Sequence, residues 1–557
     1  MGVGRGVIGS TKAANRFGVW GLIGVAIANA LLYALGITAR YPLAIGLRSV
    51  RAGWATLVGR SLKVGVGFAG VYVLLIVAYV VALRLILRLP DCRPRRTIGI
   101  IVVGWLLSSA ALLGAYPGES FDIFDYVFRG RMIVEYSASP LATAPAVFQN
   151  QPFYSYITWR GQVDTYGPLW EYASGAVAWA VHAVFGRAGS HVAYIVGYRL
   201  LAVSLVGLCG LLVALIVRRS APQLVSAALL AWLWNPLVLI TTAVGAHNDL
   251  LMLVAILAAL LLFQRQRWVW GLLALALAAH VKLTALLVLP VFVIWVLRRC
   301  GWVRTLRICA LALAFAIPLS WLLYAPFGGW VTLQRMLQER ARLLINSPAD
   351  LVYRLLQERF GWSEPAAWRT TTQAATLAFL VIAAGILIWF WWASRYATTR
   401  PALGTSGISL GEKLNVESAG QAPDALLWRA ALAVTLAYLL LGSFWFQHWY
   451  LLWVLAPAVL LPNSRWTRTL LPVYCLGALL SNLTNSFARN QPGYPLTDTQ
   501  VGALNGLAQV APLLCVLLAT RIWHDAPGLL TAVRRIRAAS RSTVAHAAAA
   551  QELDHRS

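Results

Sequence analysis

The sequence predicts an all-α polytopic membrane protein, for three reasons. Hydrophobic residues make up 60% of the 557-residue chain and charged residues only 12%, whereas about 25% of residues in soluble proteins are charged. Apolar runs of about 18 or more residues recur from Phe17 to Thr520, and each could cross a bilayer core of roughly 30 Å. The runs lack the alternation of barrel strands, so we expect helices. A soluble enzyme and a porin are excluded.

Fifteen apolar runs are candidate membrane-spanning helices, and we expect about 13 to 15 crossings. The first run is too long for a signal-peptide core and is expected to remain as an anchor. The runs lie at 17–37, 66–88, 98–116, 168–186, 190–217, 222–244, 248–264, 268–281, 283–298, 305–324, 371–394, 427–445, 449–462, 469–483 and 501–520.

The net charge of +27 is explained by membrane topology rather than by binding to nucleic acid. Basic residues cluster in short loops between apolar runs, as at Arg218/Arg219 and Arg298/Arg299. Placing these loops in the cytoplasm puts the long loop 117–167 outside. The same threading requires one of the segments 168–186 and 190–217 to be re-entrant or bent.

Polar stretches divide the chain into five predicted regions. Loop 117–167 reads as short interfacial helices, and 325–370 has two amphipathic pieces that suit a membrane surface. The regions are an N-terminal membrane hairpin (1–97), a catalytic transmembrane module with external loop 117–167 (98–324), a second external loop with amphipathic helices (325–370), a C-terminal transmembrane module with cytoplasmic linker 396–424 (371–520) and a cytoplasmic tail (521–557).

The first external loop holds the best candidate for chemistry. Asp122 and Asp125 are three residues apart, so on a helix they share one face. A carboxylate there could act as general base on a hydroxyl acceptor, while Arg129 and Arg131 receive a phosphate leaving group. The structural alternative is an amphipathic helix whose acids favour its N-terminus and pair with its arginines.

The same loop closes with a Tyr-Gly-Pro turn that predicts a helix start. Tyr166, Trp170 and Glu171 are candidate sugar- or acceptor-binding residues, although a structural corner explains them equally. In SFWFQHWYLLW, Gln447 and His448 lie within a run of aromatic residues. An interfacial aromatic belt and a sugar-binding shelf both fit that pattern.

Polar residues inside apolar runs mark a second group of candidates. His247, Asn248 and Asp249 follow a Gly-Ala break, where they form either a helix cap or part of a functional cavity. Lys282 is one of only four lysines, and it either extends to an interface or binds a lipid-linked phosphate. Arg199 lies inside a candidate span and needs a cavity or a partner.

Taken together, these motifs resemble the GT-C polyprenyl-phosphate-mannose-dependent α-mannosyltransferases of bacteria. The resemblance rests on the acidic first external loop, YGPLW closing it, NPL followed by GAHND, VKLT before LLVLP and the late QHWYLLW. These motifs occur in matching order over roughly residues 98 to 460.

The resemblance implies a GT-C-type fold and transfer of a sugar, mannose by this comparison, from a polyprenyl-phosphate donor to a lipid or glycan acceptor. It places the catalytic aspartate at Asp122 and the site on the external face of a bacterial plasma membrane. Direct displacement would invert the anomeric carbon. The loop has no DxD motif, which leaves a divalent-metal cofactor open, and the scattered cysteines predict no metal cluster.

Two alternatives remain at this point. A flippase or transporter of polyprenyl-linked sugars would also carry basic and aromatic residues, but with polar groups near the middle of the bilayer. A ligase that moves a whole oligosaccharide or polymer would share the fold class. The arginines of 325–370 are consistent with such a ligase.

Overall fold

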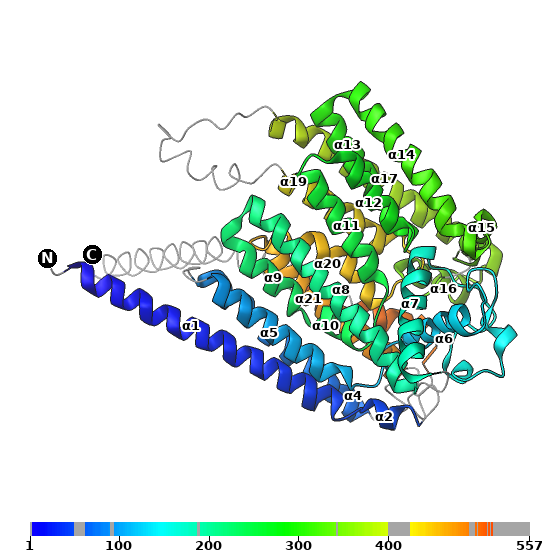
Figure 1. The fold of residues 1–557 in the computed structure, drawn as a ribbon, viewed down its shortest axis with the longest axis horizontal. Coiled ribbons are helices and arrows are strands. Elements are labelled where there is room, and N and C mark those ends of the chain that lie inside the picture. Colours follow the sequence, from blue (N-terminus) through cyan, green and yellow to red (C-terminus); the bar gives the residue numbers. More distant parts are fainter. Residues whose placement is uncertain are drawn as a thin grey trace, which may run out of the picture.

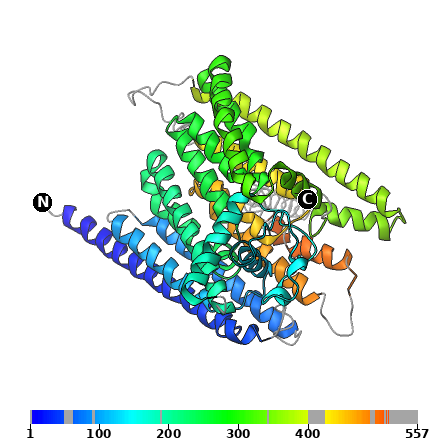
Figure 2. The ribbon, with the colours of Figure 1, turned by 45° about the vertical axis from the view of Figure 1, so that its right-hand side comes forward.

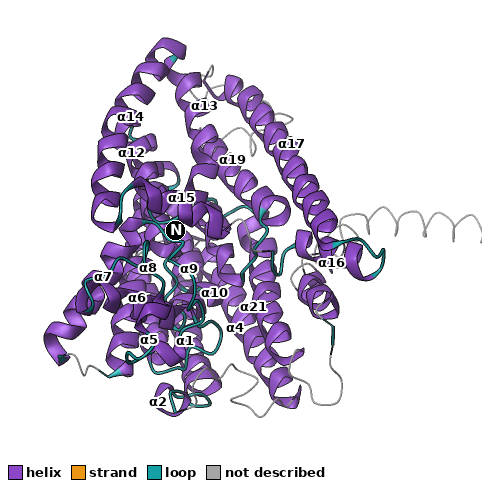
Figure 3. Ribbon diagram, turned by 90° about the vertical axis from the view of Figure 1, so that its right-hand side faces the viewer, coloured by secondary structure: helices purple, strands orange, loops and turns teal. Residues whose placement is uncertain are grey.

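The computed structural model describes residues 3–48, 62–89, 94–186, 190–340, 344–398, 424–488, 496–497, 499–508 and five residues between 511 and 518. In these parts the secondary structure is helical, and Figure 3 shows it without strands. The expected all-α class is therefore confirmed. The predicted tail 521–557 and most of the linker 396–424 lie outside the described residues.

The bounds of the elements follow the chain order. The α-helices are α1 (Val3–Tyr33), α2 (Leu43–Gly46), α4 (Leu62–Arg88), α5 (Pro94–Leu113), α6 (Asp122–Glu135), α7 (Pro168–Phe185), α8 (His191–Ser220), α9 (Val225–Leu233), α10 (Pro236–Ala243), α11 (Asp249–Gln264), α12 (Trp268–Ala279), α13 (Leu289–Cys300), α14 (Trp302–Tyr324), α15 (Trp330–Arg340), α16 (Pro348–Glu358), α17 (Glu364–Thr398), α19 (Asp424–Ala437), α20 (Leu452–Val459) and α21 (Leu471–Ala488). Short 3-10 or π-helical elements are η1 (Ala34–Thr38), η2 (Pro145–Phe148), η3 (Tyr154–Tyr156), η4 (Pro222–Leu224), η5 (Leu283–Val288), η6 (Ala325–Phe327), η7 (Tyr438–Gly442), η8 (His448–Leu451) and η9 (Trp466–Leu470).

The bundle has a buried centre and two apolar flanks. Helices α9 and α10 are buried at every residue, which is typical of helices that are apolar on all sides and surrounded by protein. Helix α1 packs against α4 and α5 on one flank. Helix α17 runs along the opposite flank, as Figure 2 shows. Many of its side chains are exposed apolar residues, as expected where a helix faces lipid.

Fewer helices are long and apolar enough to cross a membrane than the sequence suggested. The described residues contain eight, or nine if one bent pair counts as a single span. The expected number of 13 to 15 is therefore too high by length and composition. The runs at 248–264 and 268–281 form the shorter helices α11 and α12, of 16 and 12 residues. An apolar run alone does not distinguish a crossing from a short buried helix.

The one bend that divides a candidate span falls at a different place than predicted. Within the described residues it lies between Pro222–Leu233 and Pro236–Ala243, which meet at 49°, and not within 168–217. Asn235 explains the break, because its side-chain oxygen accepts the N–H of Leu237 and so starts a new helix before Pro236.

Short helices gather at one end of the bundle. Figure 1 shows α6, α15 and α16 together on its right-hand side, away from the start of α1. Helices α15 and α16 are the amphipathic pieces expected in 325–370. Helix α16 begins cleanly because Ser347 accepts the N–H of Asp350 and Pro348 occupies the first turn. This end of the bundle carries the candidate site.

Candidate functional site

A pocket of about 260 Å³ lies where the first large loop meets the late aromatic segment. Its wall comes from α6, from the loop before α7, from the start of η5 and from the chain between η7 and α20. The lining residues are Asp122, Asp125, Tyr126, Arg129, Trp159, Gln162, Val163, Asp164, Thr165, Tyr166, Thr284, Tyr438, Gly442, Ser443, Phe444, Trp445, Trp449, Tyr450 and Trp453. Segments almost 300 residues apart in sequence therefore build one cavity.

Asp122 is the carboxylate with the freest access to this pocket. It starts α6, where its N–H is bonded to the Oγ of Ser120 at 3.2 Å, and its side chain is 19% exposed. Burial raises the pKa of Asp122 above its usual value, while His247, 3.8 Å from its Oδ2, opposes that rise. An accessible carboxylate of raised pKa suits a general base.

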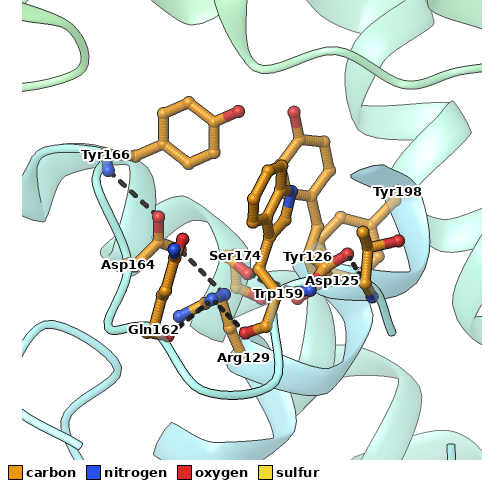
Figure 4. Close-up of polar contacts among 10 residues, drawn as sticks. Asp125, Tyr126, Arg129, Trp159, Gln162, Asp164, Tyr166, Ser174 and Tyr198 are labelled. Carbon is orange, nitrogen blue, oxygen red and sulfur yellow. Dashed lines mark hydrogen bonds and ion pairs between the residues drawn. The ribbon is translucent and has the colours of Figure 1, made fainter. Parts of the chain in front are cut away.

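Asp125 lines the same pocket but is committed to the backbone. Its two oxygens accept the N–H groups of Thr158 and Trp159, each at 3.1 Å, as Figure 4 shows. Burial raises the pKa of Asp125 to about 7, against the opposing effects of Arg129 and these N–H groups. The carboxylate therefore anchors the loop that carries Trp159.

Arg129 also organises this loop. Its guanidinium donates to the carbonyl oxygens of Trp159 and Gln162, at 3.2 and 3.1 Å, and lies 3.4 Å from Asp164. Asp164 in turn accepts the N–H of Tyr166 at 3.0 Å, and Figure 4 shows the chain of contacts. The pocket wall is thus held by buried charge-assisted hydrogen bonds.

Arg131 and Arg199 lie outside the pocket lining. Arg131 makes a two-bond pair with Glu135 and lies against the ring of Phe153. Arg199 is fully buried and donates to the carbonyl oxygens of Leu113 and Val244, at 2.6 and 3.0 Å. These carbonyls end α5 and follow α10, so Arg199 caps the two helices that lead into the site.

The GAHND segment forms the break between α10 and α11. Ala246 has a φ of 52°, and a side chain at Gly245 would collide with the carboxylate of Glu119. The break therefore brings His247 against the first loop. Asn248 is fully buried, and its side-chain atoms have no hydrogen-bond partner among the described residues.

Lys282 is buried behind the aromatic wall of the pocket. Its Nζ is 2.7 Å from Oδ1 of Asp249 and lies 5.1 to 5.7 Å from the ring centres of Tyr166, Tyr450 and Trp453. The side chain therefore does not extend into lipid. The ion pair and the three ring contacts place a positive charge next to the cavity.

Glu119, which motif reasoning did not select, is the centre of a buried network. Nε2 of His448 donates to Oε2 of Glu119 at 2.6 Å, and Nε2 of His247 lies 3.6 Å from Oε1. Burial opposes ionisation of Glu119, but the two histidines outweigh it and lower its pKa to about 2. His448 is therefore engaged with an acid and is not one of the lining residues.

The remaining predicted binding residues are divided by the structure. Tyr166 lines the pocket, whereas Trp170, Glu171 and Gln447 do not. Trp170 packs edge-on against Tyr126, and Glu171 is fully buried beside Asp164. Gln447 precedes η8 and is half-buried.

Sequence reasoning missed most of the aromatic wall. Trp159 and Trp445 face each other with ring centres 5.4 Å apart, and Tyr450 stacks on Trp453 at 4.4 Å. The density of rings in SFWFQHWYLLW was the available signal, but the attention went to its polar residues. Rings of this kind suit a sugar, whose C–H faces stack on aromatic surfaces.

A metal site does not emerge from the part of the chain that the structure describes. There, no group of three or more His, Cys, Asp or Glu side chains is placed to hold an ion. The carboxylates near the pocket instead pair with His, Lys, Arg or backbone N–H groups.

Comparisons with known proteins bear on the chemistry of this pocket. A family model described as alpha-(1->6)-mannopyranosyltransferase, N-terminal domain, matches residues 16–299. Alpha-(1->6)-mannopyranosyltransferase A of Corynebacterium glutamicum is 27% identical over 190 residues, 33% of this chain and 36% of that protein. The protein of the same name from Mycobacterium tuberculosis is 30% identical over 219 residues, 38% of each chain. The aligned part thus spans little more than a third of each relative.

Proposed function

Because the chain belongs to the alpha-(1->6)-mannopyranosyltransferase family, we propose that it transfers mannose to an acceptor hydroxyl at the pocket beside Asp122. The donor is a polyprenyl-phosphate-linked mannose, and the acceptor is a lipid or glycan. The observation that carries the proposal is the position of Asp122, an accessible carboxylate on the wall of an aromatic pocket. The site faces the external side of the membrane.

The reaction is a single displacement. The acceptor oxygen forms a bond to the anomeric carbon while the bond from that carbon to the phosphate oxygen breaks, and Asp122 takes the hydroxyl proton. The polyprenyl phosphate leaves with the electron pair. One displacement inverts the anomeric carbon, so an alpha-linked product, as in the names of the relatives, requires a beta-linked donor.

Each part of the pocket has a role in this reaction. The rings of Trp159, Tyr450 and Trp453 stack on the sugar. Lys282 supplies positive charge that favours the developing phosphate negative charge. His247, Asn248 and Asp249 form the inner end of the cavity region, where we propose that Asn248 accepts and donates hydrogen bonds to donor hydroxyls.

Turnover with a defined donor tests the proposal. Purified protein is incubated with radiolabelled polyprenyl-phosphate-mannose and membrane glycolipid acceptors, and labelled product is measured. The wild type should form product, and Asp122→Asn should lose at least about a hundredfold in rate while keeping its thermal stability, because the amide keeps the shape and cannot accept the proton. Absence of turnover with any sugar on this carrier would favour a flippase.

A further inference from the structure

His247 lies between two carboxylates of the first external loop. Its Nε2 is 3.6 Å from Oε1 of Glu119, and its Nδ1 is 3.8 Å from Oδ2 of Asp122. The side chains of His247 and Glu119 are completely buried. An imidazole that faces one carboxylate with each nitrogen is well placed to act on the charge of both.

Packing fixes the orientation of this imidazole. Its ring stacks on Trp449 with ring centres 3.7 Å apart and planes 16° apart. The glycine at position 245 allows the Glu119 carboxylate to approach the break before α11. The ring therefore cannot turn its nitrogens away from the two acids without losing the contact with Trp449.

The groups form a row of alternating charge that ends at the proposed base. His448 donates to Glu119 at 2.6 Å, Glu119 faces His247, and His247 faces Asp122. An ionised Glu119 favours positive charge on both histidines, and a positive His247 favours negative charge on Asp122. Glu119 thus acts on Asp122 through the histidine between them.

Other charged and titratable groups also surround this row. They are Asp125 and Tyr126 on α6, Tyr166 before α7, Asp249 at the start of α11, Lys282 before η5, Arg199 on α8 and Tyr72 on α4.

We propose that His247 is a positioning residue that, held by Glu119 and Trp449, keeps the Asp122 carboxylate ionised and directed into the pocket. The inference rests on the proposed function and adds a residue that prepares the base. It gives Glu119 a defined part in the site. Neither residue touches the reacting atoms.

The physical effect appears in the dependence of activity on pH. Burial raises the pKa of Asp122, and the positive charge of His247 opposes that rise. Without the histidine, a larger fraction of Asp122 is protonated near neutral pH, and a protonated carboxylate cannot accept the acceptor's proton. Raising the pH restores the ionised base, so the lost activity returns under alkaline conditions.

The test compares pH profiles of kcat/KM, with radiolabelled polyprenyl-phosphate-mannose as donor. His247→Phe keeps a flat ring against Trp449 and removes both nitrogens. Its acidic limb should move upward by at least about one pH unit, so that activity below that limb falls roughly tenfold. Near pH 9 the loss should shrink, and donor KM should remain within about twofold.

Glu119→Gln provides a second variant that keeps the shape of its side chain. It removes the negative charge that favours a positive His247, so its acidic limb should move in the same direction. The double variant should shift no further than His247→Phe alone, because both changes act through one histidine. His182→Phe is the matched control: His182 lies 3.9 Å from Glu135, outside the pocket, and its loss should leave the profile unchanged.

Several results would overturn the inference. They are an unshifted profile in folded His247→Phe or Glu119→Gln protein, a loss that is equal at every pH, and a shift toward lower pH. The proposed function fails separately, if the wild type has no turnover or if Asp122→Asn remains active. An inactive Asp122→Asn with an unshifted His247→Phe profile would refute only the role of His247.

Discussion

The ammonium nitrogen of Lys282 lies 2.7 Å from Oδ1 of Asp249, and both side chains are buried. The indole nitrogen of Trp453 donates to the same oxygen at 2.6 Å, so a pocket ring and a buried ion pair share one atom. Removing either charge leaves the other unpaired in a low-dielectric interior. The pair therefore joins the stability of the bundle to the shape of the cavity.

Lys282→Met should destabilise the protein by about 3 to 5 kcal/mol, because it leaves Asp249 charged and unpaired. Adding Asp249→Asn should recover much of the loss, since the amide no longer needs a cation. Thermal melting of the two single variants and the double variant in detergent measures this coupling. A normal melting temperature for Lys282→Met, together with a tenfold or larger rise in donor KM, would instead indicate a lysine that mainly contacts phosphate, roughly as one charge-assisted hydrogen bond predicts.

Asp125→Asn should differ from Asp122→Asn in kind. An amide at position 125 can accept only one of the two N–H groups of Thr158 and Trp159. The loop should loosen, with a lower melting temperature and a loss of rate of about tenfold to a hundredfold from misplaced pocket residues. Melting and kcat are measured together. Equal kinetic losses at both positions, with normal stability, would indicate a proton shared by the two acids.

Asp125 also makes the stability depend on pH. Its ordinary pKa is 3.8, and burial raises it to about 7 in the folded protein. Between these values the folded state binds more protons than the unfolded state, so the free energy of unfolding falls as the pH rises. Melting temperatures between pH 4 and 7 should decline more steeply for the wild type than for Asp125→Asn. Parallel curves would contradict this origin of the dependence.

Labelling of single cysteines tests the orientation of the site. In a cysteine-free background, Val147→Cys and Phe360→Cys place exposed thiols in the two predicted external loops. A membrane-impermeant maleimide added outside intact cells should label both. Gln223→Cys, which follows Arg218 and Arg219, should label only after the membrane is opened. Labelling of position 147 only from the cytoplasmic side would contradict an external lipid-linked donor.

Local sequence patterns predicted the helical class and the acid that opens the pocket. Apolar length identified α4, α5 and α8, and the start of α6 placed Asp122 and Asp125 together. The same reasoning did not foresee that Arg131 pairs with Glu135 four residues later, although that spacing favours such a pair. Counting charges near an acid does not show which of them are already satisfied.

Contacts between distant segments were beyond any local pattern. Glu119 and His448 are separated by 329 positions, and no periodicity relates them. Short buried helices such as α12 are as apolar as true spans, so the sequence overstated the crossings. Asn235 and Pro236 were a readable break, since an Asn cap before Pro starts a helix.

The late origin of one wall has a consequence for biosynthesis. When about the first 300 residues have been inserted into the membrane, Glu119, Asp122, His247 and Lys282 are all present, but His448, Trp449 and Trp453 are still to be made. Until they arrive, Glu119 lacks its closest cation and the sugar-stacking surface is missing. A nascent chain therefore passes through the translocation machinery as an inactive precursor and completes its cavity only when its last third folds back on the first loop.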